Sequence, residues 1–316
     1  MTAMNHRIRF RHKMKSKVDY SRYGWYFIIP FVVVFLVFGL YPMLYSLQIS
    51  FTDLKNWNTE FDYVGFENYA KILKLPRFWT AMGNTCVLFV LFFVPQMLLS
   101  LLLAYWFTTP GMRVRGMGLF KGCMYLPSII TPVSIGMLYA LFFEYPRGPI
   151  NILLQQMGLS GDPINFFLQT DAARVMLAYV QNWVGYGPMM IMFVGAILGI
   201  NPELFEAGCI DGCSNRQMFF KITLPLIRPI LLYNMVCCVI GGFQIFDIPR
   251  SLTGGGPRNT TLTISMFIYN TAFSGSRSFN TAAAASYLLM IFIAAVSVVV
   301  YFLMRGHERP ERRQRA

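Results

Sequence analysis

Long apolar runs separated by short polar stretches dominate the pattern of this chain. A helix needs roughly 20 apolar residues to cross the roughly 30 Å of hydrocarbon in a bilayer, and six segments are long enough. They lie near Trp25 to Leu47, Gly83 to Phe107, Cys123 to Phe143, Val175 to Ile200, Pro229 to Phe246 and Ala282 to Met304. None shows the two-residue alternation of a membrane β-barrel, and backbone groups in lipid must be hydrogen-bonded internally. The pattern therefore predicts an all-α membrane protein with six transmembrane helices.

Composition supports this assignment to the membrane. Apolar residues make up 55% of the chain and charged residues 13%, against about 45–50% and about 25% in soluble domains. The first apolar run is longer than the core of a signal peptide, and no cleavage site of small residues follows it. We therefore expect this run to remain as a membrane anchor.

Basic residues are distributed unequally between the alternate sides of the predicted spans. One side holds 18 of the 27 Lys and Arg residues together with six acids, whereas the other side holds nine basic residues and eight acids. Because cytoplasmic loops are enriched in Lys and Arg, this predicts that both termini lie in the cytoplasm. The chain then divides into a basic tail (1–24), a six-helix domain (25–304) and a second basic tail (305–316). The net charge of +13 is explained by this topology and by tails lying near anionic lipid, so it does not indicate a nucleic-acid partner.

Several function classes lack their characteristic residues. The chain contains no GxxxxGK[ST] phosphate-binding loop, and residues 254–256 precede Pro257, which indicates a turn. All three histidines lie in the tails, and the six cysteines form no CxxC pair. We therefore expect no catalytic residues, no metal site and no cofactor bound by this chain. An ion-coupled carrier or a channel remains an alternative, although Asp247, at the outer end of the fifth span, is the only acid near a span.

The segment 201–229, which we call the bracket, lies between the fourth and fifth spans and has the chemistry of a folded loop. Asn201 can accept the free amide hydrogens of a first helical turn, and Pro202 suits the first helical position. The sequence predicts a helix from about Pro202 to Ile210. Asp211-Gly212 should then interrupt it, since glycine tolerates positive φ.

A second helix of the bracket is predicted to begin at Ser214. Ser214 and Gln217 have the spacing of a capping box, and Leu224-Pro225 should end the helix. The bracket would then expose charged and aromatic side chains, a combination typical of a protein-binding surface. These side chains are Glu203, Phe205, Glu206, Asp211, Arg216, Phe219, Phe220 and Lys221.

The bracket resembles the cytoplasmic "EAA" loop of permease subunits of ATP-binding-cassette (ABC) importers. The matching residues are Glu206-Ala207, Asp211-Gly212, Ile222, Leu224-Pro225 and Pro229. Four other stretches resemble the maltose-transporter branch, whose members import sugars: 64–69, 126–128, 182–186 and 252–257. The resemblance covers roughly residues 25 to 304, with a core domain at about 81–304. It implies the type I ABC importer permease fold.

The resemblance also implies partners and a coupling site. Partners would be a second homologous permease subunit, two ATPase subunits that carry ATP and Mg, an extracytoplasmic solute-binding protein and lipid of a bacterial or archaeal inner membrane. The residues that would couple this chain to the ATPase are Glu206, Ala207, Gly208, Asp211, Gly212, Leu224 and Pro225. Gly208 departs from the family pattern, which usually has alanine there; glycine loosens a helix by roughly 1 kcal/mol.

Polar and aromatic residues interrupt the fourth and fifth spans and are candidates for a substrate path. They are Gln181, Asn182, Trp183 and Tyr186 in the fourth span, and Phe243 and Gln244 in the fifth. Such groups can bind a sugar, or they can join helices to one another. The resemblance adds Val184, Gly185, Pro188 and Gly242, although Gly242 stands where maltose transporters have an amide. Between Val175 and Phe246 the spans contain no Lys or Arg outside the bracket. This favours a neutral oligosaccharide over glycerol 3-phosphate, the alternative in the same family.

Overall fold

The structure is a computed structural model that describes residues 20–54, 61–109, 116–274 and 277–305. The chain divides into two units, Met1–Gln48 and Ile49–Ala316. The first unit contains α1 (Tyr20–Phe35), a π-helical turn (Leu36–Leu40) and most of α2 (Tyr41–Ser50). The wider π turn ends two residues before Pro42, whose ring does not fit against an α-helical turn. Together these elements form a candidate span over Gly24–Ser50.

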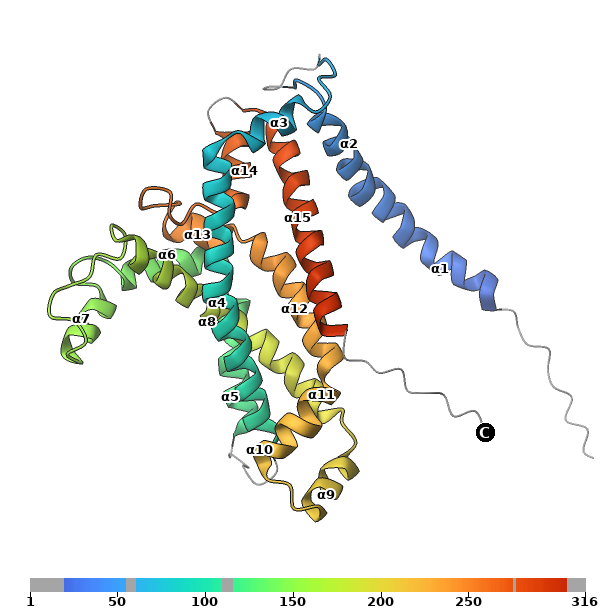
Figure 1. The fold of residues 1–316 in the computed structure, drawn as a ribbon, viewed down its shortest axis with the longest axis vertical. Coiled ribbons are helices and arrows are strands. Elements are labelled where there is room, and N and C mark those ends of the chain that lie inside the picture. The colour runs from blue at the N-terminus through green and yellow to red at the C-terminus, as the bar shows by residue number, and fades with distance from the viewer. Residues whose placement is uncertain (1–19, 55–60, 110–115, 275–276, 306–316) are drawn as a thin grey trace, which may run out of the picture. The chain divides into compact units, whose positions relative to one another are not determined.

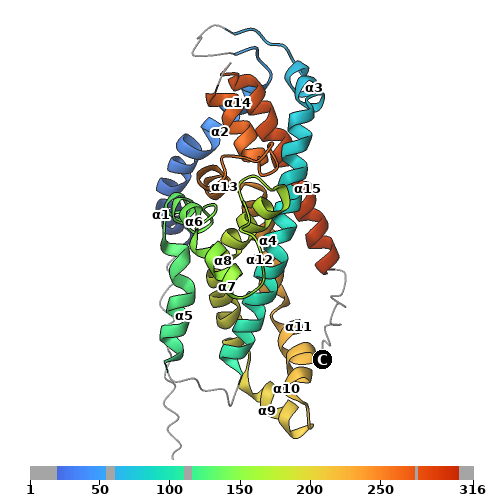
Figure 2. The same cartoon turned by 90° about the vertical axis from the view of Figure 1, so that its left-hand side faces the viewer.

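The second unit is a bundle of helices. Its long members are α4 (Pro76–Thr108), α8 (Thr170–Leu198), α12 (Arg228–Phe243) and α15 (Phe279–Arg305). Its shorter members are α3 (Glu67–Leu73), α5 (Met117–Tyr125), α6 (Pro132–Phe142), α7 (Pro149–Gln156), α9 (Pro202–Ile210), α10 (Asn215–Met218), α11 (Leu224–Leu226), α13 (Asp247–Leu252) and α14 (Ile264–Phe273). Helices α9 and α10 lie at one end of this unit, and α3 and α14 lie at the other (Figure 1, Figure 2).

Four helical segments of the described chain are long and apolar enough to cross a membrane, and counting two bent helix pairs as one span each gives up to six. The prediction of six spans is met in this sense, but the third is not one helix. Residues Met117–Ile129 meet α6 at 97°. Pro132 lacks an N–H group and keeps Thr131 extended, at φ −61° and ψ 134°. A single helix over Cys123 to Phe143 was therefore a wrong prediction.

Several helix ends also differ from the predicted spans. Helix α4 begins at Pro76, whereas the predicted span begins at Gly83. The prediction counted only the uniformly apolar sequence, and the first turns of the helix lie before it. Helix α12 ends at Phe243, where the Gln244 N–H donates to the Gly241 carbonyl, and Asp247 begins a separate helix. Helix α8 begins at Thr170, which places Arg174 inside it.

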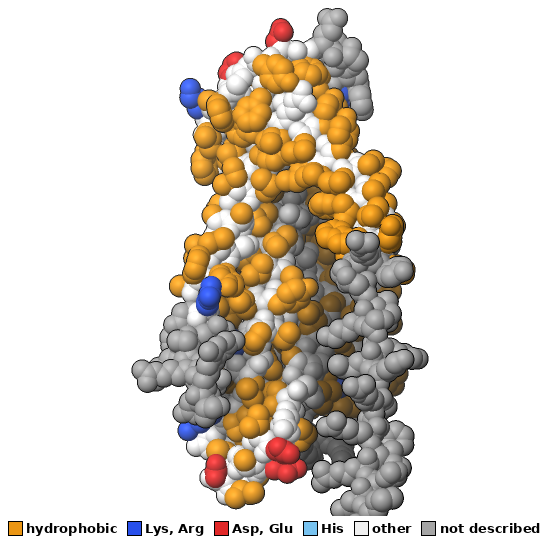
Figure 3. All heavy atoms as spheres, turned by 90° about the vertical axis from the view of Figure 1, so that its right-hand side faces the viewer, with side chains coloured by type: hydrophobic (Ala, Val, Ile, Leu, Met, Phe, Trp, Pro, Cys, Tyr) orange, Lys and Arg blue, Asp and Glu red, His pale blue; other side chains and the backbone are white. Residues whose placement is uncertain are grey.

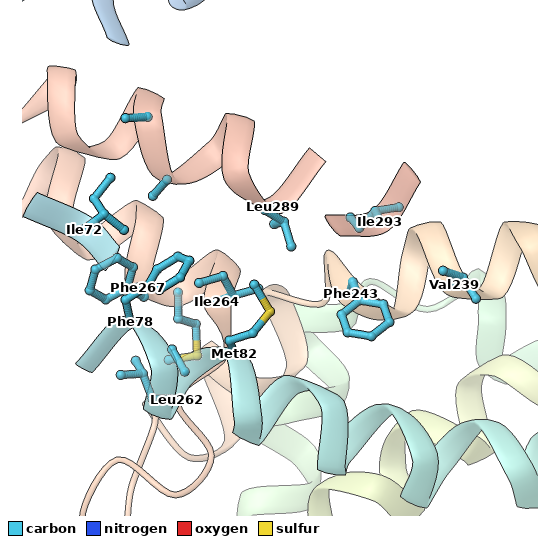
Figure 4. Packing of buried hydrophobic residues seen from close by; sticks show 14 residues of the cluster. Ile72, Phe78, Met82, Val239, Phe243, Leu262, Ile264, Phe267, Leu289 and Ile293 are labelled. Atoms are coloured by element: carbon cyan, nitrogen blue, oxygen red, sulfur yellow. The ribbon is translucent and has the colours of Figure 1, made fainter. Parts of the chain in front are cut away.

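Apolar side chains from several helices form the interior of the second unit. Helices α4 and α8 pack together most extensively. Near α3, Phe78 of α4 lies edge-on to Phe267 of α14 with ring centres 5.9 Å apart (Figure 4). Hydrophobic side chains also cover much of the surface presented in Figure 3, as expected for helices that contact lipid.

The stretch 64–69, which carries part of the family resemblance, builds a buried polar junction. Asn68 is 1% exposed. Its Nδ2 donates to the carbonyls of Ser50 at 2.9 Å and Thr52 at 2.7 Å, and its Oδ1 accepts from Asn280 Nδ2 at 3.1 Å. One amide thereby satisfies two buried carbonyls and joins α3 to the start of α15. The role of Asn68 in this structure is structural.

Replacing Asn68 by leucine is expected to destabilise the protein by about 3 kcal/mol or more, because each buried polar group left without a partner costs about 1–3 kcal/mol. Thermal unfolding of the detergent-solubilised protein measures the effect. Asn215→Leu is the control, since that side chain is exposed. Equal melting temperatures for the two variants would show that the junction contributes nothing.

Candidate functional site

The first helix of the bracket forms where its local chemistry predicts. Asn201 Oδ1 accepts the Glu203 amide hydrogen at an N–O distance of 3.1 Å, and Pro202 occupies the first turn of α9. Asn201 Nδ2 also donates to the Glu203 carboxylate at 3.1 Å. The helix ends at Ile210, as predicted.

Gly212 makes the turn between the two helices of the bracket. Its φ is +73°, a left-handed conformation that only glycine adopts at low cost. The Gly212 amide donates to the Cys209 carbonyl at 3.1 Å and the Cys213 amide to the Gly208 carbonyl at 2.9 Å. These bonds satisfy the last carbonyls of α9 and reverse the chain.

The second helix of the bracket begins with the predicted capping box. The Ser214 amide donates to Gln217 Oε1 at 2.8 Å, and the Gln217 amide donates to Ser214 Oγ at 3.3 Å. The helix passes through a π-helical segment, Phe219–Thr223, and ends as α11 at Leu226. The π segment ends two residues before Pro225, whose ring would clash with a regular turn. The sequence predicted the ends of this helix but not its widened middle.

Gly208 allows close approach of the two helices within the bracket. It is buried, and a Cβ atom on it would lie 3.0 Å from Ile222 Cδ1. The neighbour is the end of a flexible side chain, so the alanine of the family pattern would fit after a small shift. Gly208 therefore faces the interior of the bracket and not its outer surface.

The bracket is fixed to the rest of the bundle through the end of α4. Tyr105 donates its hydroxyl to the Asn215 carbonyl at 2.8 Å, and its ring lies 4.6 Å from that of Phe219. Thr223 and Ile227 are buried beneath. These contacts connect any movement of the bracket to α4 and α12.

The outer surface of the bracket carries exposed charges. Glu203, Glu206 and Asp211 are exposed, and the ion pair found among the described residues, Lys71 with Glu67, lies elsewhere. Glu206 also borders a cavity of about 400 Å³ between α9 and the ends of α4 and α8. Ile210 is 88% exposed at the tip. An ordered, charged surface with an exposed apolar tip can bind a protein partner.

The candidate path residues of α8 lie mostly in contacts between helices. Asn182 Nδ2 donates to the Phe92 carbonyl at 3.3 Å, and the Tyr186 carbonyl accepts from Ser100 at 2.9 Å. The Trp183 ring meets Tyr139 edge-on at 5.4 Å. A Cβ on Gly185 would lie 2.6 Å from the Gln96 side chain. Gln181, Val184 and Pro188 are half-buried on the same helix.

The candidate path residues at the end of α12 divide into two kinds. Gly242 lies under Phe89, where a Cβ would come within 2.4 Å of that ring. The Phe243 ring packs between Phe89 and Phe292, with ring centres 5.0 and 5.1 Å away. Gln244 alone of the three is exposed, and it lines a groove of about 620 Å³ between α12, α14 and α15.

Sequence reasoning missed three residues that organise this region. Gln96 fills the space over Gly185, and its position as an amide in an apolar run could have revealed it. Tyr139 pairs with Trp183, a contact between distant helices that one sequence does not reveal. Arg174 donates to Asn84 Oδ1 at 2.9 Å and to the Thr260 carbonyl at 3.3 Å. The predicted start at Val175 left this cation out of the fourth span.

The membrane-length helices and the ordered bracket between α8 and α12 are the features expected of a transport subunit of the membrane. The sequence profile of the family described as "Binding-protein-dependent transport system inner membrane component" matches residues 70–313, and the chain belongs to this family. The predicted class, a permease subunit of an ABC importer, is confirmed by this membership.

Individual relatives cover nearly the whole chain. The lactose transport system permease protein LacF of Rhizobium radiobacter is 31% identical over 297 residues, which cover 93% of this chain and 97% of the relative. The trehalose/maltose transport system permease protein MalF of Thermococcus litoralis is 27% identical, with coverages of 94% and 99%. A bacterial alginate ABC transporter, solved in complex with an alginate pentasaccharide-bound periplasmic protein, is similar with a TM-score of 0.73 and 27% identity. It covers 92% of this chain and 96% of its own.

Proposed function

We propose that this chain is one of two homologous permease subunits of a sugar importer. Two ATPase subunits binding ATP and Mg would drive it, and an extracytoplasmic solute-binding protein would deliver the sugar. The observation that carries the proposal is the ordered bracket with its left-handed turn at Gly212 and its exposed carboxylates. A loop that only joined two spans would not need capped helices.

In the proposed mechanism the bracket sits in a groove of an ATPase subunit. Glu206 presents its carboxylate to a basic group of the ATPase, and Asp211 and Gly212 form the tip. Closure of the ATPase dimer pulls on the bracket, and the contact of Tyr105 with Asn215 passes this movement to α4. Different contacts in the two states then favour inward-open or outward-open spans.

The proposal places the bracket and both basic tails in the cytoplasm of a bacterial or archaeal cell, with the chain in the inner membrane. The excess of Lys and Arg on that side supports this orientation. The end that carries α3 and α14 would then face the solute-binding protein.

We propose an oligosaccharide as the substrate. The relatives named above are permeases for lactose and for trehalose or maltose, and an alginate transporter has a similar fold. These names favour a sugar over glycerol 3-phosphate, and the family disfavours a carrier or channel that works without an ATPase.

Uptake by the intact importer tests this function. The importer, with its cognate subunits and binding protein, is reconstituted in proteoliposomes and offered lactose, maltotriose, arabinotriose and an alginate trisaccharide. We expect ATP-dependent accumulation of at least one of these sugars, and none when the ATPase is omitted. Uptake of glycerol 3-phosphate alone, or uptake without the ATPase, would refute the proposal.

A further inference from the structure

We infer that the basic C-terminal tail, residues 306–316, binds in the cavity beside Glu206 through an arginine side chain and competes there with the ATPase. The fit of the tail to the cavity is argued from this chain alone. The competition rests on the proposed function, because it requires that the ATPase contacts Glu206.

The walls of the cavity are mainly apolar and leave room for a long side chain. Its volume is about 400 Å³. Ile197 and Leu198 at the end of α8, Phe205 of α9 and Met218 of α10 line it, together with Tyr105 of α4. Long basic side chains bury their apolar stems against such walls while the charged group stays at a polar rim.

The polar atoms of the cavity favour an occupant that donates hydrogen bonds. The Tyr105 hydroxyl donates to the Asn215 carbonyl at 2.8 Å, and the Thr108 and Thr109 hydroxyls donate to carbonyls of α4 at 2.8 and 2.7 Å. A hydroxyl carries one hydrogen, so these three oxygens can only accept further bonds. Glu206 adds a carboxylate at the rim. An arginine side chain has five N–H donors and no acceptor, and it matches this set.

Two long helices end at the cavity and make it more favourable for a cation. Helix α4 has 33 residues and α8 has 29, and the last turn of each lines the cavity. The C-terminal turn of a helix carries a partial negative charge. The start of α9 has the opposite sign, but Asn201 caps it and Glu203 places a carboxylate in its first turn. The cavity therefore suits a cation with an apolar stem.

The tail starts at the end of the bundle that holds the cavity. Met304, in the last turn of α15, packs against the apolar cluster that contains Ile197, and Ile197 also lines the cavity. The end of α15 lies near α11 and α12 (Figure 1, Figure 2). The arginines that follow are Arg309, Arg312, Arg313 and Arg315. An extended chain covers roughly 3.3 Å per residue, so these arginines can lie roughly 13 to 33 Å from Arg305.

The tail suits the cavity better than the other cations that follow α4 directly. Arg113 and Arg115 belong to the segment 110–115, which must connect Thr109 to Gly116. That segment is fixed at both ends and contains two arginines. The tail is attached to the described fold only through Arg305 and contains four. It can therefore present several arginines to the cavity in turn.

An arginine in the cavity would share the Glu206 carboxylate that the proposed mechanism assigns to the ATPase. The ATPase would have to displace the tail before it could bind the bracket. Its apparent affinity for the permease would then be reduced by the fraction of permeases whose cavity is free. Because the tail is held partly by charge, this reduction should weaken as the salt concentration rises.

Disulfide crosslinking in membranes that contain both permeases but no ATPase tests where the tail binds. Cys209 lines the cavity and is exposed, and Gln314→Cys places its partner between two tail arginines. Oxidation with copper phenanthroline should join the two residues, as detected by mass spectrometry of proteolytic fragments. We expect Glu206→Gln to lower the yield at least threefold. Glu203→Gln is the control, since Glu203 is exposed on the same helix outside the cavity lining.

The affinity of the ATPase for the two-permease complex tests the competition. Replacing the four tail arginines by glutamine should lower the Kd of the ATPase about threefold or more. The control replaces Arg7, Arg9, Arg11 and Lys13 of the N-terminal tail by glutamine, which is the same change of charge. It should leave both the Kd and the disulfide yield unchanged.

The outcomes separate this inference from the proposed function. Absence of the disulfide, or a yield that Glu206→Gln does not change, would overturn binding of the tail in the cavity. A higher yield in the double variant Arg113→Gln/Arg115→Gln would place segment 110–115 there and overturn it too. An unchanged or higher Kd in the tail variant would overturn the competition. Failure of the wild type to accumulate any sugar would refute the proposed function and leave the disulfide result standing.

Discussion

Replacing Gly212 by valine is expected to reduce ATP-dependent uptake and sugar-stimulated ATPase activity at least tenfold, while the chain still inserts in the membrane. The reason is conformational. Gly212 has a φ of +73°, and no atom lies within 4 Å of where its Cβ would be. The Cβ of valine would therefore meet no other part of the fold, but valine would disfavour the left-handed turn by about 1–2 kcal/mol or more. The two helices of the bracket would lose their fixed relation, and Ile210 and Asp211 would move.

Two control variants make this result specific to the turn. Gly212→Asn should retain most activity, because asparagine tolerates the left-handed conformation better than valine. Gly208→Ala should be close to wild type, because only Ile222 Cδ1 has to shift and alanine strengthens the helix. Normal uptake and normal ATPase stimulation in Gly212→Val would show that the bracket is not needed for coupling.

Replacing Gly187 by alanine is expected to destabilise the bundle by about 1–3 kcal/mol, the range for overpacking a close contact. A Cβ there would lie 2.3 Å from the Met124 carbonyl oxygen and 3.0 Å from Tyr125 Cα. Both are backbone atoms and cannot rotate away. The C-terminal end of helix α5, just before the third span bends, would have to move off α8. Thermal unfolding in detergent should show a lower melting temperature, with reduced uptake.

A second glycine of the same helix provides the control. Nothing lies within 4 Å of a Cβ on Gly195. Gly195→Ala should therefore leave the melting temperature unchanged or raise it slightly, since alanine favours the helix. If both variants melted alike, close packing of α5 on α8 would not contribute to stability.

Local chemistry explains why the bracket could be predicted from sequence. Asn201, Ser214 and Gln217 act on backbone groups within three residues of themselves, and Gly212 acts on its own dihedral angle. The apolar runs predicted the spans for a similar reason, because a membrane span depends mainly on the length of its own apolar sequence. The π-helical segments escaped prediction, because widening of a turn depends on how a proline is accommodated in three dimensions.

The candidate path could be predicted only in part. Contacts between distant helices decide which of its residues pack against another helix and which face a groove. Gly185 and Gly242 suit a path by position, yet Gln96 and Phe89 of α4 lie over them. Asn182 and Gln244 are both amides in apolar spans, but one bonds to a neighbouring helix and the other faces a groove. Residue type does not distinguish these cases. The break in the third span shows the same limit, because Pro132 acts only on the backbone beside it and does not determine the angle of 97° between the two helices.

Photo-crosslinking at the tip of the bracket tests the central claim most directly. The photo-reactive residue p-benzoylphenylalanine would replace Ile210, which is 88% exposed, or Phe66, which is 73% exposed near α3 at the opposite end. In membranes containing the whole importer, position 210 should crosslink to the ATPase subunit and position 66 should not. A crosslink to the ATPase from position 66, or none from position 210, would contradict the proposal that the ATPase drives transport by binding the bracket.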